Sequence, residues 1–284
     1  MSQPAMTIHI GFGTTLRRHL DLYRRLVGAQ IRSQAQYRVA FLIDVLGTAL
    51  SVGSFFLSIA LVLQRFGNLG GWTLAEIAFL YGMLETSFGF MDMIFSGFDP
   101  GGFGQRVRRG TFDQLLLRPI DITLQVLGSE FVLRRMGRIL QGAAILIFAV
   151  RAADIVWTTG KVAYLPFVLL GMVAFFGGLF VIGATITFWT IESIEVVNIF
   201  TYGSSELISY PMHIFPGWLR TLFTYIIPAG LLNYYPALYF LDRTDPFGLP
   251  GFMRFVAPLA GLAVLSLALA FWRFGIRRYQ STGT

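Results

Sequence analysis

Three acidic residues, Glu85, Asp92 and Glu206, lie inside long apolar stretches of the chain. Placing a charge at the centre of a membrane helix costs about 2.5 to 3.5 kcal/mol on insertion scales, so such residues are functional candidates by default. Glu85 and Glu206 are expected to lie deepest, in a translocation path or at a dimer interface. For Asp92, as for Asp44, an ion pair with Arg38 or Arg106 near one end of a span is favoured over a substrate role.

The other chemistry that the sequence could support is limited. A nucleotide-hydrolysing P-loop needs the pattern GxxxxGK[ST], and the single lysine, Lys161, is followed by valine. Three scattered histidines and the absence of cysteine leave no credible transition-metal site and no thiolate nucleophile. We therefore expect no catalytic residue, no cofactor and no metal in this chain, and no histidine or aspartate cluster points to a lipid-modifying enzyme.

The composition indicates a membrane protein. Of the 284 residues, 55% are hydrophobic and 13% are charged, whereas soluble domains carry about 25% charged residues. Several runs exceed the roughly 20 apolar residues that a helix needs to cross the hydrocarbon core. The net charge of +7 comes from arginines beside these runs, which indicates membrane orientation and no nucleic-acid partner. The expected fold is a single all-α transmembrane domain over residues 1–284.

Six transmembrane helices are predicted, preceded by a basic amphipathic helix at 14–36 that lies on the membrane or on a partner subunit. The predicted spans cover 39–63, 73–98, 136–152, 162–190, 196–211 and 254–273. Glu192 and Glu195, before the fifth span, are expected to pair with arginines on the inner side. The polar stretch 99–120 is predicted to be an inner loop.

Within the segment 212–241, the uncharged stretch 222–241 is long and apolar enough to be counted as a further span, but Pro228 and Pro236 interrupt it. We predict that it folds back as a re-entrant outer segment. An even number of spans then keeps Arg273, Arg277 and Arg278 on the same side as the N-terminal arginines. That topology places 16 arginines inside and six basic residues outside, in agreement with the positive-inside tendency.

Helical spacing in the inner loop predicts one apolar side, formed by Val107, Phe112, Leu115 and Leu116. Arg106, Arg109, Asp113 and Gln114 would then face water or a partner. On the spacing alone, an interfacial helix with arginines reaching toward the lipid headgroups explains the pattern equally well.

The same loop resembles the one between spans two and three in ABC-2 type permeases, where a charged residue, Gly-Thr, a polar residue, Leu-Leu and proline follow one another. In that family the loop is the coupling helix, which sits in a groove of the cytoplasmic ATPase. Arg109 stands where many members carry glutamate. The resemblance implies an ATPase-coupling role for Arg106, Arg108, Arg109, Gly110, Thr111, Asp113, Leu116, Arg118 and Pro119.

The second half of the chain looks like a subfamily of bacterial ABC-2 permeases that has a long aromatic segment between spans five and six. The resemblance is carried by Phe188-Trp189-Thr190, Tyr210-Pro211-Met212, Pro216-Gly217-Trp218-Leu219-Arg220, Ile227-Pro228 and Asn233-Tyr234-Tyr235-Pro236-Ala237. It implies that this segment closes the outer end of the translocation path, with Trp218, Pro228, Asn233, Tyr234, Tyr235 and Pro236 as the outer gate.

Taken together, the resemblances imply the permease subunit of an ATP-binding-cassette exporter in a bacterial cytoplasmic membrane, with both termini cytoplasmic. The expected partners are two copies of a separately encoded ATPase, which would carry ATP and Mg, a second permease, identical or homologous, and membrane lipids. The alternative is an ion-gradient-driven transporter or channel that uses Glu85 and Glu206 as a relay. The sequence does not indicate a substrate.

Overall fold

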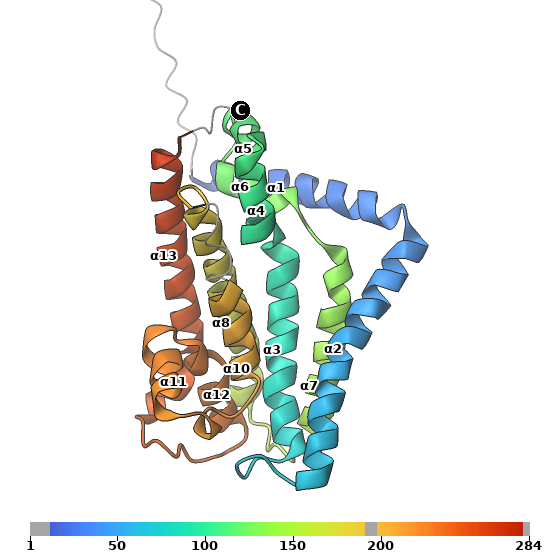
Figure 1. Ribbon diagram of the computed structural model, residues 1–284, viewed down its shortest axis with the longest axis vertical. Helices are drawn as coiled ribbons and strands as arrows, with labels where there is room; N and C mark the ends of the chain where they lie inside the picture. Colours follow the sequence, from blue (N-terminus) through green and yellow to red (C-terminus); the bar gives the residue numbers. More distant parts are fainter. Residues whose placement is uncertain (1–11, 191–197, 281–284) are drawn as a thin grey trace, which may run out of the picture.

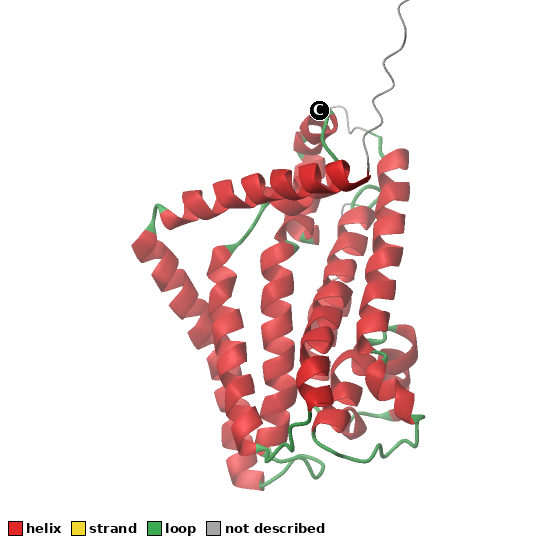
Figure 2. Ribbon diagram, turned by 180° about the vertical axis from the view of Figure 1, so that it is seen from behind, coloured by secondary structure: helices red, strands yellow, loops and turns green. Residues whose placement is uncertain are grey.

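The computed structural model describes residues 12–190 and 198–280, with side chains from residue 21 onward, and these residues are mostly helical (Figure 2). Within these ranges, the only β-type pairing is one isolated bridge between Leu69 and Trp72. The expectation of an all-α fold is confirmed. Glu192 and Glu195 lie outside the described residues, and so do their predicted ion pairs.

Six long helices form most of the molecule: α1 (Phe12–Ala35), α2 (Arg38–Phe66), α3 (Leu74–Ile94), α7 (Met136–Ala152), α8 (Thr159–Ile186) and α13 (Ala257–Arg278). Three short helices join α3 to α7: α4 (Pro100–Arg108), α5 (Thr111–Leu116) and α6 (Ile122–Ser129). Before α13 come a π-helical turn (Ile199–Gly203), α10 (Ser204–Ile208), α11 (Gly217–Thr221), a second π-helical turn (Leu222–Ile226) and α12 (Ala229–Phe240).

Four helices in the described part of the chain, α2, α3, α8 and α13, are long and apolar enough to cross a membrane. They fall on four of the six predicted spans. The third predicted span coincides with α7, which has 17 residues. In the described part of the fifth, the π-helical turn runs directly into α10, which ends at Ile208, before Pro211.

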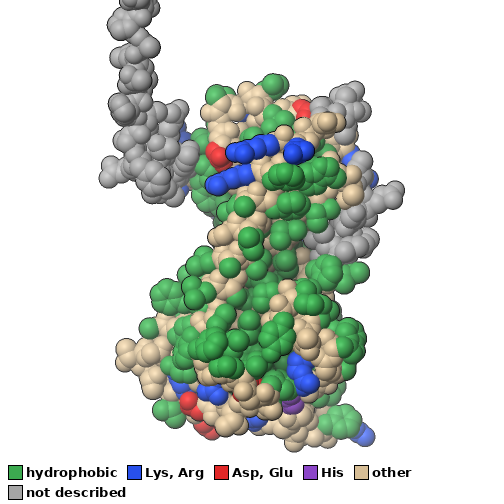
Figure 3. All heavy atoms as spheres, turned by 90° about the vertical axis from the view of Figure 1, so that its left-hand side faces the viewer, with side chains coloured by type: hydrophobic (Ala, Val, Ile, Leu, Met, Phe, Trp, Pro, Cys, Tyr) green, Lys and Arg blue, Asp and Glu red, His purple; other side chains and the backbone are tan. Residues whose placement is uncertain are grey.

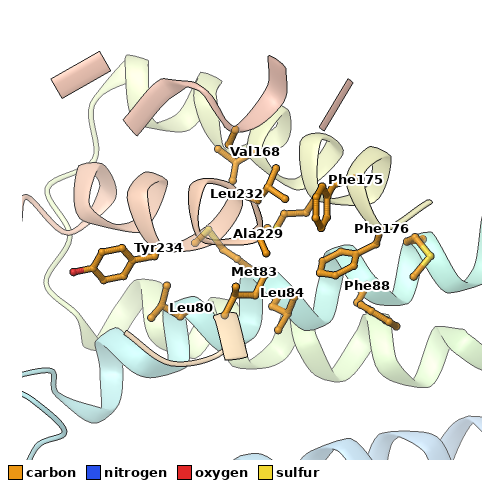
Figure 4. Packing of buried hydrophobic residues seen from close by; sticks show 14 of the residues in the cluster. Leu80, Met83, Leu84, Phe88, Val168, Phe175, Phe176, Ala229, Leu232 and Tyr234 are labelled. Carbon is orange, nitrogen blue, oxygen red and sulfur yellow. The ribbon is translucent and has the colours of Figure 1, made fainter. Parts of the chain in front are cut away.

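Helix α3 forms the centre of the bundle. It begins with a capping box, in which the Glu76 carboxylate accepts a hydrogen bond from the Thr73 backbone N–H at 2.8 Å while the Thr73 hydroxyl accepts one from the Glu76 N–H. Its apolar side chains pack against α8 and α12 (Figure 4). In the most apolar 18-residue window, 83% of the positions are buried in α3 but only 6% in α2. Helix α2 is therefore left at the edge of the bundle.

The short helices gather at two opposite ends of the bundle (Figure 1). Helix α1, the α4–α6 segment and the last turns of α13 lie at one end, which we call the α5 end. Helices α11 and α12 lie at the other, the α12 end, with the loops that follow α2 and α7. On the face drawn in Figure 3, charged side chains gather toward both ends and the middle is apolar. That arrangement suits a molecule whose middle is surrounded by lipid.

Candidate functional site: the turn between α4 and α6

The predicted coupling loop folds as two short helices with a sharp break between them. Asp99 caps α4 by accepting a hydrogen bond from the Gly102 N–H at 2.9 Å, and Pro100 occupies the first helical position. The break falls at Gly110, whose φ of 66° lies in the left-handed region that favours glycine. No single helix therefore spans residues 106–116, yet three members of the predicted apolar side, Val107, Phe112 and Leu115, still pack in or against the core.

An aromatic cluster holds α5 against the bundle. Phe112 is fully buried, and its ring lies 5.1 to 6.3 Å from four others. We call this set the aromatic anchor: Phe103, Phe112, Phe188, Trp272 and Tyr279. The indole of Trp272 also donates a hydrogen bond to the Thr123 hydroxyl of α6 at 3.2 Å. The anchor thus connects α4, α5 and α6 to α13 and to the segment after α8.

Two of the predicted coupling residues point into the protein. The Arg106 guanidinium donates a hydrogen bond to the Ser129 hydroxyl at 2.7 Å and forms an ion pair with Glu130. The Asp113 carboxylate faces the Tyr279 hydroxyl, and burial of that hydroxyl together with the carboxylate raises the pKa of Tyr279 to about 12. Arg106 and Asp113 were expected to face water or a partner, but both are half-buried and are engaged within the protein, Arg106 by residues at the end of α6 and Asp113 by the residue that follows α13.

The remaining members form an exposed surface around the end of α5. Arg108, Arg109, Thr111, Arg118 and Pro119 are all exposed. Leu116, expected on the buried side, is 38% exposed, and Leu117, which the sequence analysis did not select, is 85% exposed. The buried Gln125 amide fixes this turn by donating hydrogen bonds to the carbonyl oxygens of Leu115 and Ile120. We call the surface formed by Arg108, Arg109, Thr111, Leu116, Leu117, Arg118 and Pro119 the α5 tip.

The acidic residues of α3 pair with arginines at the start of α7. The Glu85 carboxylate accepts hydrogen bonds from Arg138 at 2.6 and 2.9 Å, and Asp92 lies 2.8 Å from Arg135. Asp92 thus forms an ion pair as expected, but with Arg135 and not with Arg38 or Arg106. The carboxylates and guanidiniums can reach each other because α3 and α7 pack together over much of their length. Glu85 and Asp92 are seven residues apart on one face of α3, opposite the basic start of α7.

Glu206 is placed differently from Glu85 and Asp92. It is exposed and lines a cavity of about 280 Å³ between α2, α3 and α10. The walls are mainly apolar, and the other polar groups include those of Ser209 and Tyr210. The structure therefore does not bring Glu206 into the ion pairs of α3.

The predicted outer-gate residues form no single cluster. The Asn233 amide is buried and donates hydrogen bonds to the carbonyl oxygens of Leu80 at 3.1 Å and Ile208 at 2.8 Å, which ties α12 to α3 and α10. Tyr234 stacks on Trp72 with ring centroids 5.7 Å apart. Tyr235 and Pro236 are also buried, and Pro228 precedes α12. Trp218, by contrast, is 69% exposed on α11.

These features define a class of protein: an α-helical membrane protein with a fixed, basic, partly apolar tip at one end of its bundle. A profile of the family described as ABC-2 family transporter protein matches residues 49–283, and the chain belongs to this family. A search of curated proteins finds no match. Members are membrane transport subunits that are generally not catalytic themselves and that associate with a separate ABC ATPase. The resemblance seen in the sequence is confirmed.

Proposed function

We propose that the protein is the membrane-spanning subunit of an ATP-driven exporter in the bacterial cytoplasmic membrane. In this proposal, residues 1–284 form one domain with six crossings, and the α5 end faces the cytoplasm. Two copies of a separate ATPase, which bind ATP and Mg, act on a pair of permeases, identical or homologous. Family membership supports the class, and the excess of arginines on the predicted inner side supports the orientation.

The observation that carries the proposal is the difference in burial between side chains of one short segment, from Thr111 to Pro119. The α5 tip exposes Leu117 among basic residues, while Phe112 fixes the same segment to the aromatic anchor. An exposed apolar side chain on a rigid base suits insertion into a groove of a partner. Closure of the ATPase pair would move the α5 tip. Through Trp272, that movement would reach α13 and open the bundle toward the outside.

In the same proposal, 212–241 is the re-entrant outer segment. Its helices α11 and α12 lie at the end opposite the α5 tip (Figure 1). Asn233 links α12 to α3 and α10, so a movement of these helices would also displace α12. The gate role of Trp218, Pro228, Tyr234, Tyr235 and Pro236 would follow from this linkage.

Co-purification with the separate ABC ATPase tests the proposal. We expect a tagged chain to bring down the ATPase. We also expect Gly110→Val to reduce the yield of the complex, because a β-branched residue cannot adopt the left-handed backbone of the α4–α5 turn without strain. Gly248→Val is a matched control, since Gly248 also has a positive φ, 67°, and lies in the loop between α12 and α13. Failure of the ATPase to co-purify with the wild-type chain would overturn the proposal.

The ion-gradient alternative would use Glu85 and Glu206. The double hydrogen bond from Arg138 engages Glu85, which favours a structural role for that carboxylate. Glu206 remains the better relay candidate, because it lines a cavity. If Glu85→Gln and Glu206→Gln leave transport intact at every pH tested, the relay is excluded. If either variant loses transport only above or only below a certain pH, the relay is favoured.

A further inference from the structure

A polar cleft lies where α1 bends into α2, outside the α5 tip and outside the cavity of Glu206. It consists of two cavities of about 560 and 570 Å³ that share two lining residues, Asp44 and Arg134. The first cavity lies between the α1–α2 bend and residues 130–134. The second lies between α2 and the start of α7, where Thr48, Ser51 and Arg138 line it. We call the pair the elbow cleft.

Specific contacts hold the walls of the elbow cleft in place. The Gln34 amide of α1 donates a hydrogen bond to the Phe131 carbonyl at 2.5 Å and accepts one from the Leu133 N–H at 2.9 Å. On the other side, α7 touches the backbone of α2 at Gly137, where an added Cβ would come within 2.2 Å of the Val45 carbonyl oxygen. The cleft is therefore a built feature of the fold and not merely a gap beside a loose helix.

The charges in the elbow cleft divide into paired and unpaired groups. Arg135 pairs with Asp92, Arg138 with Glu85 and Glu130 with Arg106. Arg134 and Asp44 are exposed, and within the described part of the chain neither forms an ion pair. The cleft thus has an unpaired cation on the α7 side and an unpaired anion on the α2 side. A ligand with both charges would complement it.

We propose that the elbow cleft binds the headgroup of an amine-bearing phospholipid, with the phosphate on Arg134 and the primary ammonium on Asp44. This inference rests on the membrane placement proposed above. A guanidinium matches the geometry of phosphate oxygens, and basic pockets between transmembrane helices on the cytoplasmic side bind lipid headgroups. The acyl chains would lie on the exposed apolar face of α2, formed by Leu42, Ile43, Leu46 and Leu50.

Asp44 determines the choice of headgroup. A primary ammonium can donate hydrogen bonds to the carboxylate, whereas the choline headgroup has no N–H and a glycerol headgroup has no positive charge. The preference for phosphatidylethanolamine over phosphatidylcholine should therefore be about tenfold or more.

Native mass spectrometry of the delipidated full chain, titrated separately with phosphatidylethanolamine, phosphatidylglycerol and phosphatidylcholine, tests the proposal. Arg134→Gln should weaken binding of all three lipids about tenfold, because each of them loses the phosphate contact. Asp44→Asn should abolish the preference for phosphatidylethanolamine and leave phosphatidylglycerol bound at least as tightly. Arg273→Gln is the matched control, since Arg273 is an exposed arginine of α13 away from the cleft, and it should change nothing.

Equal retention of all three lipids, unchanged by Arg134→Gln, would mean non-specific annular lipid only and would overturn the proposal. If Asp44→Asn weakens the binding of phosphatidylethanolamine and of phosphatidylglycerol equally, the ammonium does not bind Asp44. If Arg134→Gln does not fold, Arg134→Lys keeps the charge and should retain most of the lipid binding. Lipid binding is measured without the ATPase, so a failure here is distinct from a failure of ATPase co-purification.

Discussion

Phe112 and Leu117 lie five residues apart, yet Phe112 is fully buried and Leu117 is 85% exposed. Apolar spacing predicted that Phe112 faces inward, and it does. The spacing could not place Leu117 or Leu116, because the α5 direction depends on the backbone conformation of Gly110 and on the turn held by Gln125. Nor could it reveal the aromatic anchor, since Trp272 and Tyr279 are more than 150 residues further along the chain.

A pair of substitutions separates these two roles. Phe112→Ala should lower the free energy of unfolding by about 3 to 5 kcal/mol, the usual cost of emptying a buried aromatic site. Leu117→Ala should change it by about 0.5 kcal/mol or less, because the side chain is exposed, yet it should weaken ATPase binding. Thermal unfolding of the detergent-purified chain measures the first quantity and co-purification the second. Equal destabilisation by both changes would contradict the described arrangement.

The pair between Glu85 and Arg138 gives a second test at the residue scale. Removing one member of a buried ion pair leaves an uncompensated charge, at a cost of about 3 to 5 kcal/mol. Glu85→Gln and Arg138→Gln should therefore each destabilise the protein, and the double variant should lose less than the sum of the two. A double-mutant cycle of unfolding free energies measures this coupling. Additive losses would show that the two side chains do not interact.

Tyr279 lies just after α13, and its raised pKa predicts a change of stability at alkaline pH. Burial and the Asp113 carboxylate raise its pKa from 10.0 to about 12, so the folded protein holds the phenolic proton more tightly than the unfolded chain. The contribution of the protonated Tyr279 to the free energy of unfolding is complete below pH 10 and is lost as the pH rises through about 12. The unfolding temperature should therefore fall less steeply over this range in Tyr279→Phe than in wild type. Identical slopes would refute the contact with Asp113.

At the scale of the elements, the charged and turn-forming residues around the apolar runs made several helices predictable. The predicted spans 39–63 and 136–152 closely match α2 and α7. In the described part of the predicted span 196–211, the helix begins with a π-helical turn, which the apolar pattern did not predict, and ends at Ile208. Helix spacing alone also could not show that α2 would lie at the edge of the bundle, since burial depends on neighbours distant in sequence.

The crossing of α2 and α7 can be tested with two glycines. Gly137→Ala places a Cβ within 2.2 Å of the Val45 carbonyl oxygen, so α2 must move away, at a typical overpacking cost of about 1 to 3 kcal/mol. Gly47→Ala is the control, because its Cβ would meet nothing within 4 Å. It should be neutral or slightly stabilising, since alanine favours the helix. Comparable unfolding temperatures for the two variants would contradict the close crossing.

At the scale of the whole molecule, the fold separates two ends with different surfaces. The α5 end carries the exposed basic tip, and the α12 end carries α11 and the buried aromatic residues of α12 (Figure 1). Helix α3 connects the two ends, through its ion pairs with α7 and through the hydrogen bond from Asn233. In the proposed exporter, a movement applied at one end would reach the other through this rigid centre.

In the proposed exporter, the ATPase contacts the α5 tip. A photo-reactive residue in place of Leu117 should crosslink the ATPase in inverted membrane vesicles. The same residue in place of Trp218, which is 69% exposed on α11 at the opposite end, should not. An ATPase adduct from position 218, or none from position 117 while the ATPase still co-purifies with the labelled chain, would contradict the account.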